Sequence, residues 1–186
     1  MYHNGNKGGE YMSIKDDIKN SINYMKPGYK YSKEEIINEL NNDMEFTKQL
    51  IENNDINRVM SIMPEEVLNS NPELYFIAVD KQPQYLHNVP KEVLQNNPEA
   101  YIKVIKKDPH MLYDVPKDIQ EQYPEEVMEA VKNMPSAMRF MDKKIQEQNP
   151  EFVIDIVKET PGCIKYLAEP LKKENPQLCV EACKKI

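Results

Sequence analysis

Residues 89–114 read VPKEVLQNNPEAYIKVIKKDPHMLYD, and the chain around this stretch repeats its pattern without insertion or deletion. Successive units open 26 residues apart, at Met63, Val89, Val115, Met141 and Leu167. Sequence periods of this length are typical of stacked supersecondary units, in which each unit buries its apolar face against its neighbours. The period therefore predicts five helical repeats over residues 63–186, the last one truncated.

Prolines divide each unit into three short predicted helices. They stand at the second, tenth and twenty-first positions, and twelve of the chain's 14 prolines fall in these three columns. Proline suits the first turn of a helix because its missing N–H has no helical partner there, and it biases the preceding residue away from helix. In one unit the helices are expected to begin at Pro90, Pro98 and Pro109. We expect the side chain of Asn97 to cap the second helix.

Apolar residues recur in fixed columns that predict the core. The first residue of every unit is apolar, and the second helix carries a broad apolar stripe, such as Tyr101, Ile102 and Ile105 in one unit. A helix with so wide an apolar face must be covered by neighbouring helices. The predicted fold class is therefore all-α, with tandem 26-residue helical repeats stacked as a short α-solenoid.

Residues 12–62 predict an N-terminal helical cap that is also a degenerate repeat. Two capping boxes, which begin at Ser13 and Ser32, mark helix starts, and the first helix is expected to stop at Pro27 and Gly28. Two further short helices complete the segment. Terminal repeats are usually atypical because they must cover an open apolar face.

Residues 1–11 are expected to form a flexible tail. The segment from Lys7 to Met12 can also be encoded by a purine-rich run followed by ATG, like a bacterial ribosome-binding site ahead of a start codon. On that alternative, Met12 is the true start and the gene is bacterial or phage-encoded.

Composition limits the classes of function. The chain has 186 residues, of which 40% are hydrophobic and 30% charged, and its net charge is −7. No apolar run approaches the ~20 residues that cross a bilayer, and the first residues lack the apolar stretch of a secretory signal. A cytoplasmic location is expected. The acidic balance disfavours nucleic acid as a partner, because phosphates are bound mainly by Lys and Arg.

The residues indicate neither catalysis nor a metal site. The sequence contains no nucleophile motif, no phosphate-binding glycine loop and no HExxH. The column with Glu73 and Glu99 could form a row of metal ligands, but acid in a first helical turn is also favoured by the helix dipole. Cys179 and Cys183 are four apart, in columns that other units fill with core residues. We expect no enzyme activity, no metal and no cofactor.

A lysine column supports an alternative function. Its members are Lys106, Lys132, Lys158 and Lys184, near the end of the second helix. Such a ladder could follow a phosphate backbone, as in helical repeats that read RNA. Cations in a last helical turn are also favoured by the helix dipole, and acidic residues three positions earlier suit pairing on a solvated face. Nucleic-acid binding is therefore kept as the alternative function.

Departures from the repeat indicate where a partner could bind. Some apolar residues stand in columns that are mostly polar elsewhere, and two columns of the third helix vary freely. The candidate partner-binding residues are Leu74, Ile77, His87, Tyr113, Arg139 and Phe152. Exposed apolar side chains of this kind predict a patch for a partner. Leu74 and Ile77 can alternatively pack against the N-terminal cap.

The unit resembles a known short helical repeat. Its second helix has an acidic start, an apolar middle and an ending near Ala-Val-Lys, as in Ala78-Val79 and in Ala130-Val131-Lys132. This pattern is similar to a bacterial and protist repeat family catalogued as a domain of unknown function, which usually has Asn-Gly where this chain has the twenty-first-position prolines. The resemblance covers residues 63–186 and implies all-α stacking without a known activity.

The leading hypothesis is a non-enzymatic helical-repeat protein that binds another protein along its stacked surface. It would be a cytoplasmic adaptor, or a bacterial or phage-encoded inhibitor of a host protein. No membrane partner is expected, and the chain is expected to be a monomer or a homodimer.

Overall fold

The structure is a computed structural model that describes residues 12–24 and 30–185, and the regular elements in these two ranges are all helices. The predicted all-α class is confirmed. Over the same ranges, no helix combines the length and apolar character that crossing a membrane requires. The predicted tail at residues 1–11 and the predicted helix stop at Pro27 and Gly28 lie outside the described residues.

The chain divides into two compact units, Met1–Gln82 and Pro83–Ile186. The division falls inside the first 26-residue repeat, before its third helix, whereas the sequence prediction separated cap from repeats at residue 63. The first unit contains α1 (Ile14–Tyr24), α2 (Lys33–Asn42), α3 (Met44–Asn53), α4 (Ile56–Ile62), α5 (Glu65–Ser70) and α6 (Glu73–Lys81).

Both predicted capping boxes form in the first unit. Ser13 and Asp16 exchange hydrogen bonds between side chain and backbone N–H at 3.2 and 3.3 Å. Ser32 and Glu35 do the same at the start of α2. The isoleucines of α1, Ile18 and Ile22, are buried. In this unit α3 packs on α2, α4 and α6, so α3 is its central helix.

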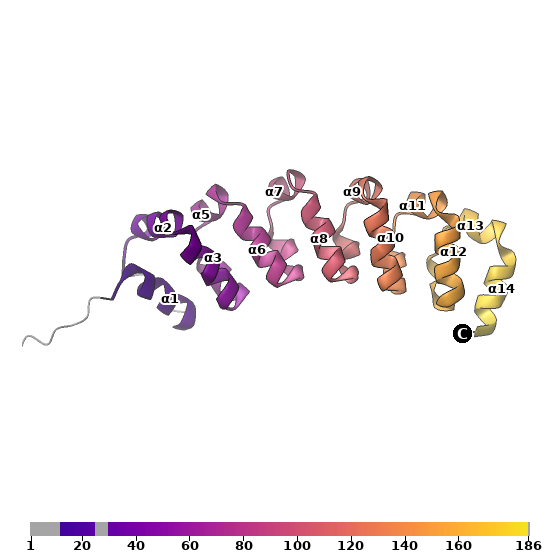
Figure 1. The fold of residues 1–186 in the computed structure, drawn as a ribbon, viewed down its shortest axis with the longest axis horizontal. Coiled ribbons are helices and arrows are strands. Elements are labelled where there is room, and N and C mark those ends of the chain that lie inside the picture. Colours follow the sequence, from indigo (N-terminus) through magenta and orange to yellow (C-terminus); the bar gives the residue numbers. More distant parts are fainter. Residues whose placement is uncertain (1–11, 25–29, 186) are drawn as a thin grey trace, which may run out of the picture. The chain divides into compact units, whose positions relative to one another are not determined.

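The second unit alternates α-helices and 3-10 helices. Its elements are η1 (Pro83–Asn88), α7 (Lys91–Gln95), α8 (Glu99–Lys107), η2 (Pro109–Asp114), α9 (Lys117–Gln122), α10 (Pro124–Asn133), η3 (Pro135–Arg139), α11 (Lys143–Gln148), α12 (Pro150–Glu159), η4 (Pro161–Tyr166), α13 (Glu169–Glu174) and α14 (Pro176–Lys185). Within this unit α8 packs on α10, α12 packs on α14, and η3 packs on both η2 and η4 (Figure 1).

Prolines stand at or directly before most helix starts of the second unit: the predicted start at Pro109 is confirmed, whereas α7 and α8 begin one residue after Pro90 and Pro98. The helices α10, α12 and α14 begin at the tenth-position proline, and the four 3-10 helices begin at the twenty-first-position proline. The helices that begin at the twenty-first-position prolines are 3-10 helices of five or six residues, a winding that is common in short connecting helices.

The asparagine before the tenth-position proline closes the preceding helix. The side-chain amide of Asn97 donates to the carbonyl of Val93 at 2.8 Å, and Asn71, Asn149 and Asn175 make the same bond four residues back. Carbonyls in a last helical turn have no helical N–H partner, so the amide satisfies one of them. The predicted capping of the second helix by Asn97 is therefore wrong, and among the described residues no side chain caps the start of α8.

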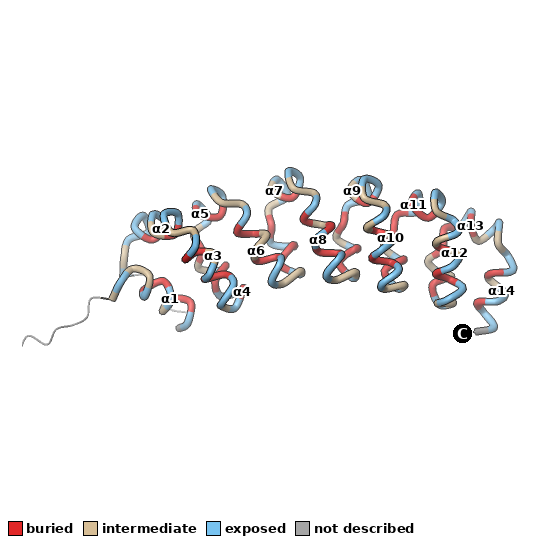
Figure 2. Tube along the Cα trace, viewed as in Figure 1, coloured by how far each residue is buried: buried red, intermediate tan, exposed pale blue. Residues whose placement is uncertain are grey.

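Most residues of the predicted core columns are buried, but Tyr101, Val93 and Ile119 are only half-buried, and α14 departs further from the prediction. Every residue that opens a repeat is at most 8% exposed. Buried stretches recur on α8, α10 and α12 (Figure 2). On α14, however, Val180 is 55% exposed and Cys183 is also exposed. The prediction that Cys183 belongs to the core is wrong, because in the described residues no further helix covers this face of α14.

Two buried glutamines connect successive repeats. Gln146, which is fully buried, accepts a hydrogen bond from the backbone N–H of Ala168 at 2.8 Å and donates to the carbonyl of Tyr166 at 3.3 Å. Gln120 makes the same pair of backbone bonds one repeat earlier, at 2.9 and 3.1 Å. Each side chain therefore links its own helix to a backbone segment about 20 residues further along the chain.

Candidate protein-interaction surface

Three of the six candidate residues lie together on the surface of the second unit. His87, Tyr113 and Arg139 belong to η1, η2 and η3, and all three are exposed. The His87 and Tyr113 ring centroids are 5.9 Å apart, and the Tyr113 and Phe140 centroids are 5.6 Å apart. The Arg139 guanidinium lies 4.3 Å from the centroid of Phe140. We call His87, Tyr113, Phe140 and Arg139 the aromatic row.

Contacts between the 3-10 helices position this row, because η3 packs on η2. His87, Tyr113 and Arg139 are spaced 26 residues apart, and Phe140 directly follows Arg139. The same pattern continues into η4, where the ammonium of Lys165 lies 4.9 Å from the centroid of Tyr166. A cation over a ring holds both side chains in place by about 0.5–1 kcal/mol at an exposed site.

The other three candidates lie on α6 and α12. Leu74 is fully buried on α6, which packs on α3. The expectation that Leu74 is exposed is therefore wrong, and its packing against preceding helices agrees with the alternative prediction. Ile77 on α6 and Phe152 on α12 are half-buried.

His87 connects the aromatic row to a carboxylate. Its Nε2 lies 2.9 Å from the hydroxyl of Tyr113, and its Nδ1 lies 3.5 Å from Oδ1 of Asp114. The Asp114 side chain is only 18% exposed. Its other oxygen, Oδ2, is buried and has no hydrogen-bond partner among the described residues. Burial raises the pKa of Asp114, and this effect outweighs those of His87 and Tyr113, which lower it.

Asp114, His87 and Tyr113 place a carboxylate, an imidazole and a hydroxyl in the order that a proton relay uses. Such a relay needs a hydroxyl that gives up its proton readily. The pKa of Tyr113 is instead raised, first by desolvation and then by the charge of Asp114. The phenol therefore stays protonated and acts as a hydrogen-bonding group. No cluster of three His, Cys, Asp or Glu side chains suited to a metal ion occurs within the described ranges.

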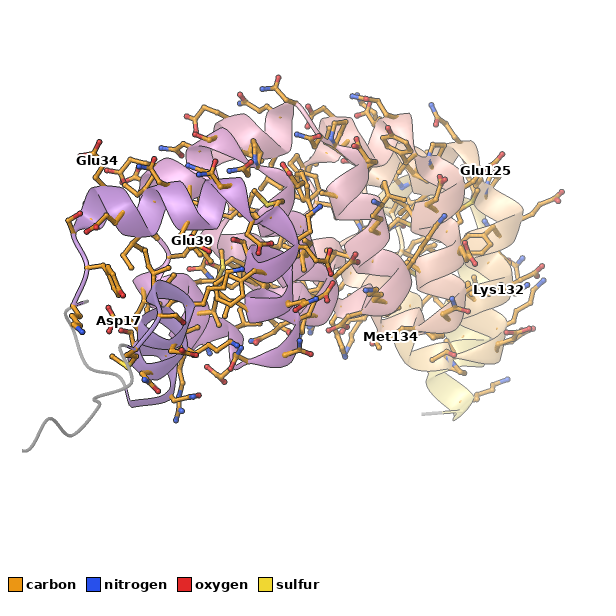
Figure 3. The ribbon with its side chains drawn as sticks, turned by 60° about the vertical axis from the view of Figure 1, so that its left-hand side comes forward. Asp17, Glu34, Glu39, Glu125, Lys132 and Met134 are labelled. Atoms are coloured by element: carbon orange, nitrogen blue, oxygen red, sulfur yellow. The ribbon has the colours of Figure 1, made fainter. Side chains whose placement is uncertain are left out.

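The lysines of the column are exposed, and acidic side chains lie close to Lys158. Lys106, Lys132, Lys158 and Lys184 are all exposed, and Lys158 pairs with Asp155 at 3.0 Å. Lys158 also lines a hollow of about 500 Å³ between α12 and α14, together with three carboxylates. On α10, Glu125 and Lys132 lie at opposite ends of the helix with their side chains pointing away from it (Figure 3). This is the arrangement that the helix dipole favours.

The cysteines differ in their surroundings. Cys163 is buried, and its thiol lies 3.3 Å from the carbonyl of Pro135. Burial raises the pKa of this thiol. Cys179 is half-buried and Cys183 is exposed. The raised pKa makes Cys163 a poor nucleophile, which suits a core role.

Asp114 and Phe140 are site residues that the sequence reasoning missed. They share one column with Asn88 and Tyr166, and Asp114 is the only carboxylate in it. That break in the period was the available signal. Asp114 was overlooked because an acidic residue beside an expected surface tyrosine resembles ordinary solvated surface.

Comparisons with known proteins gave no match. No protein-family model, no curated protein and no solved structure matches this chain. The resemblance to a helical-repeat family therefore stays a prediction from the residues alone.

Proposed function

We propose that this chain is a non-enzymatic helical-repeat protein that binds another protein through the aromatic row. The observation that supports this most is Tyr113, which is 51% exposed although aromatic neighbours hold its ring in place. Tyrosine and arginine are enriched among the residues that carry most of the binding energy in protein interfaces. A pre-positioned ring also loses little conformational entropy when a partner docks.

The chemistry of the row indicates what the partner presents. Tyr113 and Phe140 offer ring surface, and Arg139 offers a planar set of donors that matches a carboxylate. Lys165 adds a second cation one repeat further on. We propose that the partner segment carries an apolar side chain opposite Tyr113 and a carboxylate opposite Arg139.

We extend the proposal to the arrangement of the repeats and to the cellular role of the protein. The 26-residue repeats would stack as a short α-solenoid, joined by the buried glutamines, and the surface of the stack would be the binding platform. A cytoplasmic adaptor and a bacterial or phage-encoded inhibitor of a host protein both fit such a platform.

Site-specific photocrosslinking tests the binding function. A benzophenone amino acid at position 113 is expected to capture one protein from a lysate of the source organism. The matched control places the same group at Lys103, which is exposed on α8, and it is expected to capture nothing. Arg139→Ala, introduced together with the probe at position 113, should reduce capture at least tenfold.

Other capture results would contradict the proposal. Equal capture at positions 103 and 113, or capture unaffected by Arg139→Ala, would show that the aromatic row is not the binding surface. If the captured protein is a second copy of this chain, light scattering should show a dimer, and the partner would then be the chain itself.

A further inference from the structure

A hollow opens beside the aromatic row, within the repeat that begins at Val89. Its volume is about 160 Å³. The apolar wall consists of Leu86, Val89 and Leu94, and the ring of Tyr101 adds to it. A second hollow, of about 320 Å³, shares Leu94 and Tyr101 with the first. The two hollows therefore meet along these side chains.

A carboxylate stands at the polar end of the first hollow. Asp114 lines it, and Oδ2 of Asp114 is the buried oxygen without a hydrogen-bond partner among the described residues. Nearly all buried polar atoms in proteins are hydrogen-bonded, so an orphaned one calls for a physical explanation. The other carboxylate oxygen, Oδ1, lies 3.5 Å from Nδ1 of His87.

Two carboxylates act on the ring of Tyr101, which lines the hollow. The pKa of Tyr101 is raised by desolvation and further raised by the charges of Asp114 and Asp118. Both carboxylates therefore act on the same ring that lines the hollow. A positive group placed there would gain from both charges, and the loss of water would strengthen the attraction.

The repeat explains why the hollow occurs at this place. Later repeats carry the rings of Phe140 and Tyr166 in the column of Asp114, and they carry Gln120 and Gln146 in the column of Leu94. The second repeat alone has a short carboxylate in the first column together with an apolar side chain in the second. Among the repeats, this one therefore has both an apolar residue at the position of Leu94 and a carboxylate at the position of Asp114.

We propose that this hollow receives a lysine side chain of the partner protein, whose ammonium binds the carboxylate of Asp114. The proposal rests on the protein-binding function of the aromatic row. A water molecule takes up about 30 Å³, so the hollow holds about five non-hydrogen atoms, as many as a lysine side chain contains. The alkyl stem would lie along Leu86, Val89 and Leu94, as the stems of long cationic side chains do on apolar surface.

Several groups of the chain itself affect this binding. His87 and Tyr113 interact with the Asp114 carboxylate, and Lys91 lines the hollow. The exposed Lys91 ammonium can compete for the same carboxylate. Lys91→Met should therefore strengthen binding of an external cation about threefold, whereas Lys117→Met, at the equivalent position one repeat later, should leave it unchanged.

Titration with a small probe tests the hollow directly. N-acetyl-lysine methylamide is added to the full chain while the NMR signals of the Tyr101 ring and the Asp114 carboxyl carbon are followed. We expect saturable shifts in the millimolar range. N-acetyl-norleucine methylamide, which has a similar apolar chain but no ammonium, should bind at least tenfold more weakly.

Paired variants make the test specific. Asp114→Asn should weaken binding of the lysine probe at least tenfold, and Asp118→Asn, which removes an exposed carboxylate nearby, should change it less than twofold. Equal binding of the norleucine probe, or unchanged binding by Asp114→Asn in a variant that melts like the wild type, would overturn the proposal.

The crosslinking experiment separates this proposal from the binding function itself. If Arg139→Ala abolishes capture of the partner while Asp114→Asn leaves it unchanged, the aromatic row binds a protein but the hollow does not take its cation. If the lysine probe binds but no protein is captured at position 113, cation binding in the hollow is supported and the proposed protein-binding function is contradicted.

Discussion

The partly buried carboxylate of Asp114 lowers the free energy of unfolding. One of its oxygens is buried without a hydrogen-bond partner in the described part of the chain, and burial raises the pKa of the carboxyl group. Residues that reduce stability and are nevertheless present are often functional. The cost at Asp114 agrees with a role in binding a cation from outside the chain.

Replacement of Asp114 is expected to stabilise the protein. A pKa above the ordinary value of 3.8 means that ionisation is harder in the folded than in the unfolded chain. The penalty is absent below pH 3.8 and grows as the pH rises through the folded-state pKa. Asp114→Asn should therefore raise the free energy of unfolding by about 1 kcal/mol at pH 7, with little gain near pH 3.8, as measured by urea denaturation.

Asp118→Asn is the control for this stability effect. Asp118 is exposed, and its replacement should leave the free energy of unfolding nearly unchanged at both pH values. A loss of stability in Asp114→Asn at pH 7 would show that the contacts with His87 and Tyr113 outweigh the cost of burial.

Leu74 provides a second test at the level of single residues. Because its side chain is fully buried between helices of the first unit, Leu74→Ala should lower the free energy of unfolding by about 3 kcal/mol. Ile77→Ala, on the same helix but half-buried, should cost clearly less. Equal losses in thermal or urea unfolding would contradict the assignment of Leu74 to the core.

Single residues were the least predictable level from the sequence. The exposure of Leu74 and the burial of Cys183 were predicted from the columns of other repeats. The burial of each side chain depends instead on which neighbouring helix covers it. Asn97 has an amide that can serve either the helix before it or the helix after it, and spacing alone does not distinguish the two. The aromatic row was partly predicted, since a freely varying column was sufficient to select His87, Tyr113 and Arg139.

At the level of elements, the glutamine bridges follow a rule that is visible in the sequence. Gln120 and Gln146 accept from the backbone N–H of Asp142 and Ala168, the second residues of the following repeats. Proline has no N–H to donate. Where the following repeat has proline there, the glutamine is replaced by leucine, as in the pairs Leu68 with Pro90 and Leu94 with Pro116.

This pairing predicts a compensating double mutant. Gln146→Leu leaves the Ala168 N–H without its side-chain partner, while the Tyr166 carbonyl keeps the Lys143 ammonium as a donor. Ala168→Pro leaves the Gln146 oxygen without its donor. Each should cost about 1–3 kcal/mol. The double mutant recreates the leucine and proline pair of earlier repeats and should be more stable than the sum of the single effects by at least about 1 kcal/mol.

The backbone at Ala168 makes this experiment feasible. Its φ of −60° and ψ of 140° suit proline, and Leu167 before it has the extended conformation that proline requires. Strict additivity in urea unfolding would contradict the rule. The helix starts were predictable because proline acts locally, but the bridges were missed because glutamine is usually a surface residue.

At the level of the whole molecule, charge argues against nucleic acid as the partner. The net charge is −7, and Lys158 of the lysine column pairs with Asp155 in a hollow that three carboxylates line. Fluorescence anisotropy with mixed-sequence RNA and DNA at low salt should show no binding. An affinity that falls steeply with salt, and falls further in Lys106→Ala and Lys132→Ala, would instead support the lysine column as a phosphate-binding ladder.

The rule that relates Gln146 to Ala168 also limits how the gene can change. Unequal recombination between repeats copies or deletes units of 26 residues. A unit with the glutamine forms its bridge only if the second residue of the following unit has a backbone N–H. A unit with leucine at that position suits only a following unit whose second residue is proline. Duplications that join mismatched units would therefore be unstable until a second substitution follows, so the array can lengthen only in a restricted order.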